Sequence, residues 1–331
     1  MTYQDRHLPQ LAKDFCAHRD SVLLKSKNTT EAYAKGLEMF FDWFVKEKNL
    51  QKTLAEVTLD DIKTIQRKDA NDFMVYVRNQ PNKKNPNESI ATSTVIQRVQ
   101  SLISFWKYLV NNFLVDKHIF MDFEFPDIND REESKYLSYK DALKFIEAVK
   151  TSENPIRDYA IVMMFLNTGL RRSELTNIKL TDIVGNKLMF IKKGGKKRAI
   201  KLNPSVLTAI IDYLEIRPKI DSPYLWISRE NRHINKNTIY SLIKVAFKKI
   251  GITEKGYSPH TLRHSCATIL YSNGESISEI QDLLGHTTSR MTKEYAHEIE
   301  DEEFKTESIV DRNPFNQLFL KAQLKLQTQI S

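Results

Sequence analysis

Apolar residues recur at helical spacing along most of this chain, and no other feature constrains its fold as strongly. The periodic segments carry helix signals at their ends, with Ser, Thr or Asn before several of them and glycine after others. They predict helices at about 31–45, 93–111, 138–149, 157–166, 237–250, 259–273 and 277–284, and one that starts at 59 and runs towards 69 or on to 78. The first part of the chain should therefore be a bundle of four or five helices.

The segment from Ile183 to Leu202 reads differently. Gly185-Asn186 and Gly194-Gly195 are turn signals within it, and Ile200 and Leu202 alternate with polar neighbours. This pattern predicts a three-stranded antiparallel meander. The expected fold class is mainly α with a small antiparallel β-sheet.

The length of 331 residues exceeds one ordinary hydrophobic core, so two domains are expected. A boundary is indicated where the chain becomes acidic and irregular, around Pro126. We expect a helical domain at 1–115, a linker at 116–136 and a second domain at 137–311. A C-terminal helix is expected at 312–331, because Asn313 and Pro314 make a helix start and apolar residues then recur on one face.

Charge and cysteine content narrow the class of protein. The formal net charge is +8 and the isoelectric point about 9.2, which favours a polyanionic partner. Cys16 and Cys266 are far apart and have no paired spacing, which fits a reducing compartment without structural disulfides or zinc. The amino terminus lacks a signal-peptide pattern, and the longest apolar run, 160–166, is too short to span a bilayer. These features predict a soluble intracellular protein.

Six side chains in the second half of the chain are candidates for catalysis: three cationic groups, two imidazoles and one phenol. No metal-ligand cluster, glycine-rich phosphate loop or Ser-His-Asp order competes with them. The set consists of Arg171, Lys193, His260, Arg263, His286 and Tyr295.

These residue types suit the transfer of a phosphodiester. Arginines are planar, permanently charged donors for the charge that develops on the non-bridging oxygens. Tyrosine is a nucleophile once cations or a base activate it, histidine supplies that base, and lysine can protonate a departing oxygen. His260 and Arg263 lie three residues apart at the start of a helix, where backbone N–H groups favour a phosphate. The set is complete for phosphoryl transfer without a metal or another cofactor.

The local sequences around these residues carry a resemblance. They read Thr168-Gly169-Leu170-Arg171, Lys192-Lys193-Gly194-Gly195-Lys196, Pro259-His260-Thr261-Leu262-Arg263-His264, Leu283-Leu284-Gly285-His286 and Glu294-Tyr295-Ala296-His297. In these residues and spacings the chain resembles the tyrosine recombinase, or phage integrase, family. The resemblance implies an N-terminal helical core-binding domain with a SAM-like fold and an α+β catalytic domain. The segment before Ala32 leaves no room for the arm-binding domain of lambda-type integrases, so we expect the layout of Xer-type recombinases or simple integrases.

The resemblance assigns roles to the arginines and the tyrosine. Tyr295 is the expected nucleophile, and Arg171 with Arg263 clamps the scissile phosphate. Glu174, three residues after Arg171, is expected to share its helix face and to orient it.

The remaining three residues of the set handle protons and hydrogen bonds in this scheme. His260 acts as base, and His286 donates a hydrogen bond to the phosphate. Lys193 is the general acid, with Lys192 and Lys196 as its nearest rivals.

Other polar side chains are candidates for contact with DNA phosphates and bases. They lie on polar helix faces of the first domain, at the second turn of the expected meander and on the helix expected at 237–250. The candidates are Lys35, Thr94, Gln97, Arg98, Lys192, Lys196, Lys197, Arg198, Asn237, Tyr240, Ser241 and Lys244. A solvated face without a partner is the alternative for each.

The resemblance implies a site-specific recombinase that cuts and rejoins DNA through a 3′-phosphotyrosyl link and a Holliday junction. Its work is integration or excision of a mobile element, or resolution of chromosome dimers. Its partner is a double-stranded recombination site, bound by a homotetramer on two sites. A heteromer with a paralogue and an accessory directionality protein are compatible with this scheme. The expected place is the bacterial cytoplasm, at the nucleoid, without a membrane.

Alternatives remain open at this point. A type IB topoisomerase uses similar chemistry but relaxes DNA, and a non-catalytic protein would only bind it. A histidine-based metal hydrolase is disfavoured, because no carboxylate joins the histidines at ligand spacing. For the C-terminal helix, Phe315, Leu318 and Phe319 are expected to dock on a neighbouring protomer; packing on their own domain is the alternative.

Overall fold

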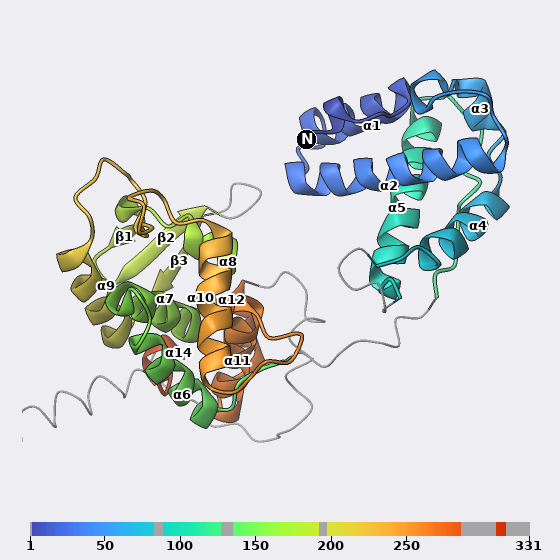
Figure 1. Ribbon diagram of the computed structural model, residues 1–331. Helices are drawn as coiled ribbons and strands as arrows, with labels where there is room; N and C mark the ends of the chain where they lie inside the picture. Colours follow the sequence, from blue (N-terminus) through green and yellow to red (C-terminus); the bar gives the residue numbers. More distant parts are fainter. Residues whose placement is uncertain (1, 83–88, 127–134, 192–196, 286–308, 316–331) are drawn as a thin grey trace, which may run out of the picture. The chain divides into compact units, whose positions relative to one another are not determined.

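The computed structural model describes residues 2–82, 89–126, 135–191, 197–285 and 309–315 (Figure 1). The chain divides into two compact units, Met1–Arg131 and Glu132–Ser331, and each has its own hydrophobic core. Most described residues are helical, and the strands form one three-stranded sheet, as the sequence predicts.

The first unit is a helical bundle around an aromatic core. α2 (Lys27–Glu47) packs on α5 (Thr92–Asn111), and a Cβ on Gly36 would lie 2.4 Å from Ser101 Oγ. Only glycine permits so close an approach of two helices here. The other elements are η1 (Tyr3–Asp5), α1 (Gln10–Ser21), η2 (Leu54–Glu56), α3 (Leu59–Lys63) and α4 (Arg67–Arg78).

Local hydrogen bonds set helix boundaries that the periodicity placed differently. α2 begins about one turn earlier than expected, because Ser26 is its N-cap and accepts a hydrogen bond from the Thr29 N–H. The helix expected from 59 towards 78 is interrupted. Gln66 N–H donates to Asp69 Oδ2 at 2.8 Å, which opens α4 as a separate helix.

Part of the stretch expected as a linker, 116–136, packs on the first unit. Phe120 is buried with its ring centroid 5.3 Å from that of Trp106, and Trp106 Nε1 donates to the Lys117 carbonyl. Arg67 donates to the carbonyls of Met121 and Asp122. These aromatic anchors stand among acidic residues, so the composition of the stretch did not reveal them.

α7 (Pro155–Thr168) forms the centre of the second unit, and every residue from Ala160 to Thr168 is buried. Around it pack α6 (Tyr139–Lys150), α9 (Pro204–Ile216) and α11 (Pro259–Ser272). α9 was not expected, although Asn203 caps its first turn by accepting a hydrogen bond from Val206 N–H. Within the described residues, no helix is both long and apolar enough to cross a membrane.

The sheet and the remaining short elements complete this unit. The strands β1 (Ile183–Val184), β2 (Lys187–Ile191) and β3 (Lys197–Lys201) are antiparallel in that order, and buried Leu188 lies opposite buried Ile200. This is the predicted meander. The other elements are α8 (Arg172–Thr176), η3 (Leu180–Asp182), α10 (Lys236–Lys249), α12 (Ile277–Leu284) and α14 (Ile309–Arg312).

The end of the described chain is anchored in the second unit. Arg312 donates from Nε to Glu275 Oε1 at 2.8 Å and from Nη2 to Glu279 Oε1 at 2.8 Å. Phe315 is fully buried, and its ring centroid lies 5.3 Å from that of Tyr139. The expectation that Phe315 docks on a neighbouring protomer is therefore wrong, because its own unit already buries it. Leu318 and Phe319 lie outside the described residues.

Candidate active site

The junction between α7 and α8 positions Arg171. Gly169 ends α7 in the left-handed conformation (φ 56°), and a Cβ there would lie 2.3 Å from Leu284 Cδ2. Arg171 is the N-cap of α8. Its N–H donates to Glu174 Oε2 at 2.8 Å, and its Nη1 donates to Glu174 Oε1 at 3.1 Å. Glu174 thus orients both backbone and side chain of Arg171, the contact that the sequence predicts.

Arg263 joins two segments that are distant in the sequence. It lies on α11 with only 5% of its surface exposed. Its Nη1 donates to the Gly169 carbonyl, and its Nη2 donates to the Leu284 carbonyl at 2.9 Å. Gly169 precedes Arg171 by two positions, and Leu284 precedes His286 by two. One guanidinium therefore fixes the backbone beside two other residues of the predicted set.

His260 lies at the amino-terminal end of α11, where the side chain of Ser258 caps the helix by accepting a hydrogen bond from the His260 N–H. Its side chain reaches the surface. Partial removal from water lowers the pKa of His260, and the guanidinium groups of Arg263, Arg172 and Arg171 lower it further. The imidazole is therefore neutral at pH 7 and able to accept a proton. These contributions also show that His260 and the arginines share one electrostatic environment.

Two neighbours on α11, His264 and Cys266, are part of the packing. Burial, followed by the charges of His260 and Arg263, lowers the pKa of His264 to about 4. Cys266 is fully buried, and burial raises the pKa of its thiol to about 12. Such a thiol is protonated and unreactive at neutral pH.

Arg198, expected to contact DNA, turns towards α12. Its Nη2 donates to the Asp282 carbonyl at 3.1 Å and its Nη1 to the Leu284 carbonyl at 3.4 Å. The nearby charges of Glu174 and Arg171 also influence its pKa, which burial lowers. Arg198 thus links the end of the meander to the carboxyl end of α12, where a cation is favoured. Sequence spacing gave no sign of this contact.

The candidate DNA-contacting residues of α10 lie on one helix but differ in their contacts. Asn237 and Ser241 are exposed. Tyr240 is 40% exposed, and the guanidinium carbon of Arg172 lies 5.7 Å from its ring centroid. Lys244 donates to the Tyr257 carbonyl at 3.3 Å. Arg172 was not among the expected residues.

In the first unit the four candidates lie on α2 and α5. Lys35 and Gln97 are exposed, and Thr94 is half-buried. Arg98 is half-buried, and its Nη1 donates to the Ala32 carbonyl at 3.4 Å. Burial lowers the pKa of Arg98.

Half of the predicted catalytic set lies outside the described residues. This half consists of Lys193, His286 and Tyr295, and the lysines at 192 and 196 and the side chain of Lys197 also lie outside the described residues. The structure therefore brings together Arg171, His260 and Arg263. Among the described residues, no group of three or more His, Cys, Asp or Glu side chains is arranged to hold a metal ion.

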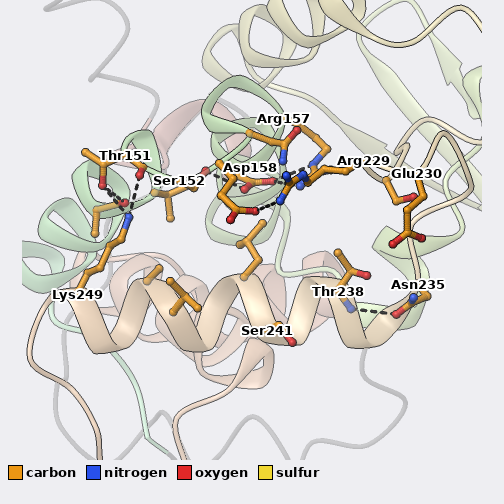
Figure 2. Close-up of a pocket in the computed structure, with 18 of the residues that line it drawn as sticks. Thr151, Ser152, Arg157, Asp158, Arg229, Glu230, Asn235, Thr238, Ser241 and Lys249 are labelled. Atoms are coloured by element: carbon orange, nitrogen blue, oxygen red, sulfur yellow. Dashed lines mark hydrogen bonds and ion pairs between the residues drawn. The ribbon is translucent and has the colours of Figure 1, made fainter.

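A pocket of about 620 Å³ lies beside α10, and the DNA-contact candidate Ser241 is among its lining residues (Figure 2). Its charged side chains are paired: Arg157 with Asp158 at 2.7 Å, and Arg229 with Glu153. Lys249 closes one end by donating to Thr151. The pocket includes neither Arg171, His260 nor Arg263, so it is separate from the candidate active site.

Comparison with known proteins decides the family. The model of the phage integrase family matches residues 135–302. A tyrosine recombinase XerC from Caldanaerobacter subterraneus subsp. tengcongensis is 34% identical over 323 residues, which cover 93% of this chain and 88% of the relative. The chain belongs to the phage integrase family of tyrosine recombinases. A XerD of this family from Listeria innocua is 30% identical and covers 82% of this chain and 88% of the relative.

Solved structures of family members share the fold. The pre-cleavage complex of the XerH recombinase with its difH substrate has a TM-score of 0.64 at 19% identity and covers 87% of this chain and 81% of that chain. The Tn1549 transposon integrase in complex with transposon right end DNA has a TM-score of 0.66 at 18% identity, with full coverage of both chains. The predicted family and fold class are thus confirmed.

Proposed function

We propose that this chain is a site-specific DNA recombinase that cuts and rejoins DNA through a 3′-phosphotyrosyl intermediate and a Holliday junction. One observation carries the proposal: Arg171, His260 and Arg263 lie close together in a member of the tyrosine recombinase family. Integration or excision of a mobile element and resolution of chromosome dimers both use this reaction.

In the cleavage step the phenol oxygen of Tyr295 bonds to the phosphorus, and the bond from phosphorus to the 5′-oxygen breaks. Arg171 and Arg263 bind the non-bridging oxygens, on which negative charge grows. His260 accepts the phenol proton, because its lowered pKa keeps it neutral at pH 7. His286 donates a further hydrogen bond to the phosphate.

The leaving group needs a proton, which Lys193 supplies to the departing 5′-oxygen. Rejoining reverses these steps with a 5′-hydroxyl from the other duplex. The phosphotyrosyl bond conserves the energy of the phosphodiester, so the scheme requires no nucleotide cofactor. Because arginines stabilise the charge, it requires no metal either, and cleavage should persist in chelator.

The partner in this scheme is a double-stranded recombination site. In their solved structures XerH is bound to its difH substrate and the Tn1549 integrase is in complex with transposon right end DNA. Exchange between two sites calls for four active sites, so we infer a tetramer, which a paralogue could share. An accessory protein that sets the direction of exchange is compatible with this arrangement.

Covalent capture tests the function. The full chain is incubated with nicked fragments of genomic DNA, denatured, and the DNA attached to protein is sequenced. A discrete site joined through its 3′ end is expected. Tyr295→Phe should bind that site with unchanged affinity and form no adduct, because only the nucleophilic oxygen is lost.

Each alternative gives a different result. Adduct formation by Tyr295→Phe would place the nucleophile elsewhere. Specific binding by the wild-type protein without any adduct would favour a non-catalytic DNA-binding protein. Relaxation of a supercoiled plasmid without four-way junctions or recombinants would favour a type IB topoisomerase, which the recombinase relatives do not support.

For the tail, we propose that residues after Phe315 dock on a neighbouring protomer. Phe315 and Asn313 belong to the core of their own unit, and Asn313 Nδ2 donates to the Leu166 carbonyl at 3.1 Å. A truncation that keeps Phe315 and removes 316–331 should preserve both this anchor and the binding of a half-site. Loss of cooperative filling of the second half-site is expected. Unchanged cooperativity and synapsis would refute trans docking.

A further inference from the structure

Arg171 and Arg172 are consecutive, yet their guanidinium groups have different neighbours. Arg171 pairs with Glu174 on its own helix at 3.1 Å. Arg172, the first residue of α8, lies over the ring of Tyr240 on α10, with 5.7 Å between its guanidinium carbon and the ring centroid. The two guanidinium groups are therefore available for different contacts.

Arg172 has the properties of an anion-binding side chain. It is half-buried, and no carboxylate in the part of the chain that the structure describes forms an ion pair with it. An aromatic face holds a guanidinium in place without neutralising it, whereas a carboxylate would cancel its charge. Tyr240 is 40% exposed, so this support stands where a ligand can reach it.

The position of Arg172 identifies the class of anion. α8 packs against α10, the helix whose exposed polar face is expected to contact DNA. Arg172 is also close enough to His260 to contribute to the electrostatic field at the imidazole. Arg172 therefore lies near both the expected DNA-reading helix and the proposed cleavage centre. A DNA strand that reaches both places passes close to this side chain.

We propose that Arg172, supported by Tyr240, binds a phosphodiester of the DNA backbone other than the scissile one. This contact fixes the distance along the strand between the bases at α10 and the bond that is cut. A phosphate contact sets register and orientation without reading sequence. The inference rests on the proposed function and adds a second phosphate site to it.

Neutral phosphate analogues test the contact. A set of duplexes containing the captured recombination site carries one methylphosphonate each, at every phosphate within three nucleotides of the cleavage position. For the wild-type protein we expect one non-scissile position where the neutral group weakens binding roughly tenfold, the size of a lost charged hydrogen bond. Arg172→Ala should bind the unmodified duplex about as weakly as the wild-type protein binds that modified duplex. A methylphosphonate at that position should not weaken its binding further, whereas those at the other positions should act as they do on the wild type.

Variants separate charge, stacking and folding. Arg172→Ala should lower the slope of log affinity against log salt by about one, whereas Lys144→Ala, which removes an exposed charge on α6, should leave the slope unchanged. Tyr240→Phe keeps the ring and should keep the wild-type response to the methylphosphonate at the Arg172 position. Tyr240→Ala should reproduce part of the Arg172→Ala loss. Equal melting temperatures for all variants would show that the fold is intact.

Two results would overturn the inference. A wild-type response of Arg172→Ala at every methylphosphonate would mean that Arg172 touches no phosphate. Loss of the response at the scissile position only would place Arg172 in the clamp with Arg171. In both cases wild-type adduct still forms, so failure of this inference is distinct from failure of the proposed function, in which the wild type forms none.

Discussion

In the first unit, candidate DNA contacts such as Lys35 and Gln97 lie exposed on helix faces, whereas in the second unit Arg263 is 5% exposed and bonded to two backbone carbonyls. The difference matches the two tasks proposed for these residues, catalysis in the second unit and DNA contact in the first. A group that stabilises a transition state must be fixed before the substrate arrives, but a surface contact can order on binding. Variants of the second unit should therefore lose cleavage, and variants of the first unit should lose affinity.

The largest effect is expected for Lys193→Ala. If Lys193 is the general acid, cleavage of a normal duplex should slow by roughly 10²- to 10⁴-fold while binding stays unchanged. A 5′-bridging phosphorothioate has a leaving group that needs no proton, and on this substrate the variant should recover. Equal defects on both substrates in single-turnover assays would show that Lys193 is not the general acid.

Gly169→Ala tests how much the close packing of Gly169 against Leu284 contributes to the stability of the second unit. The new Cβ would meet Leu284 Cδ2 at 2.3 Å and require a positive φ, so we expect a loss of about 2–4 kcal/mol in the free energy of unfolding. Gly185→Ala is the matched control: its φ is 58°, but nothing lies within 4 Å of the added Cβ, and a loss of about 1 kcal/mol is expected. Urea unfolding measures both. Equal losses would show that the contact with Leu284 is unimportant.

His264→Gln removes one titratable side chain from the same region and so tests its contribution to stability at low pH. His264 has a pKa of about 4 in the folded chain against 6.5 ordinarily, so below pH 6.5 the unfolded chain binds a proton that the folded chain refuses. Wild-type stability should therefore fall by about 2 kcal/mol from this group between pH 7.5 and 5. His260 acts in the same direction, so the variant should retain a shallower slope. An unchanged slope would contradict the assignment.

The smallest effect is expected in the first unit. Lys35→Ala should weaken DNA binding by a few-fold, roughly equally for all sequences, and lower the salt slope by about one. Adduct formation at saturating DNA should keep its wild-type rate. Lys63→Ala, on α3, serves as the control. A Lys35 variant with normal affinity but slow cleavage would break the contrast between the two units.

Much of this architecture follows from local sequence. The N-caps Ser258 and Ser276 lie directly before the helices that the pattern predicts at 259–273 and 277–284, and Gly169 and Gly285 end helices in the left-handed conformation. These signals act within a few residues, so a single sequence reveals them. The interruption between α3 and α4 was missed because the apolar periodicity continues across it and only the bond from Gln66 to Asp69 opens the new helix.

Contacts between segments that are distant in the chain could not be predicted from the sequence. Arg263 was expected in the centre, but its bonds to Gly169 and Leu284 depend on how α7, α11 and α12 pack. The turn of Arg198 towards α12 and the stacking of Arg172 on Tyr240 arise in the same way. Residue type identifies which groups can do the chemistry, and only the packed fold identifies what holds them.

The bond from Arg312 to Glu275 limits where Tyr295, the proposed nucleophile, can be supplied from. Glu275 lies just before α12, and Gly285 ends that helix, which at eight residues is about 12 Å long. The chain that carries Tyr295 thus leaves one end of a short helix and is fastened again near the other. Whatever path it takes between, both of its ends stay within one protomer. Such tethering holds a group at an effective concentration of order millimolar, so a tyrosine from another subunit would have to outcompete the resident one.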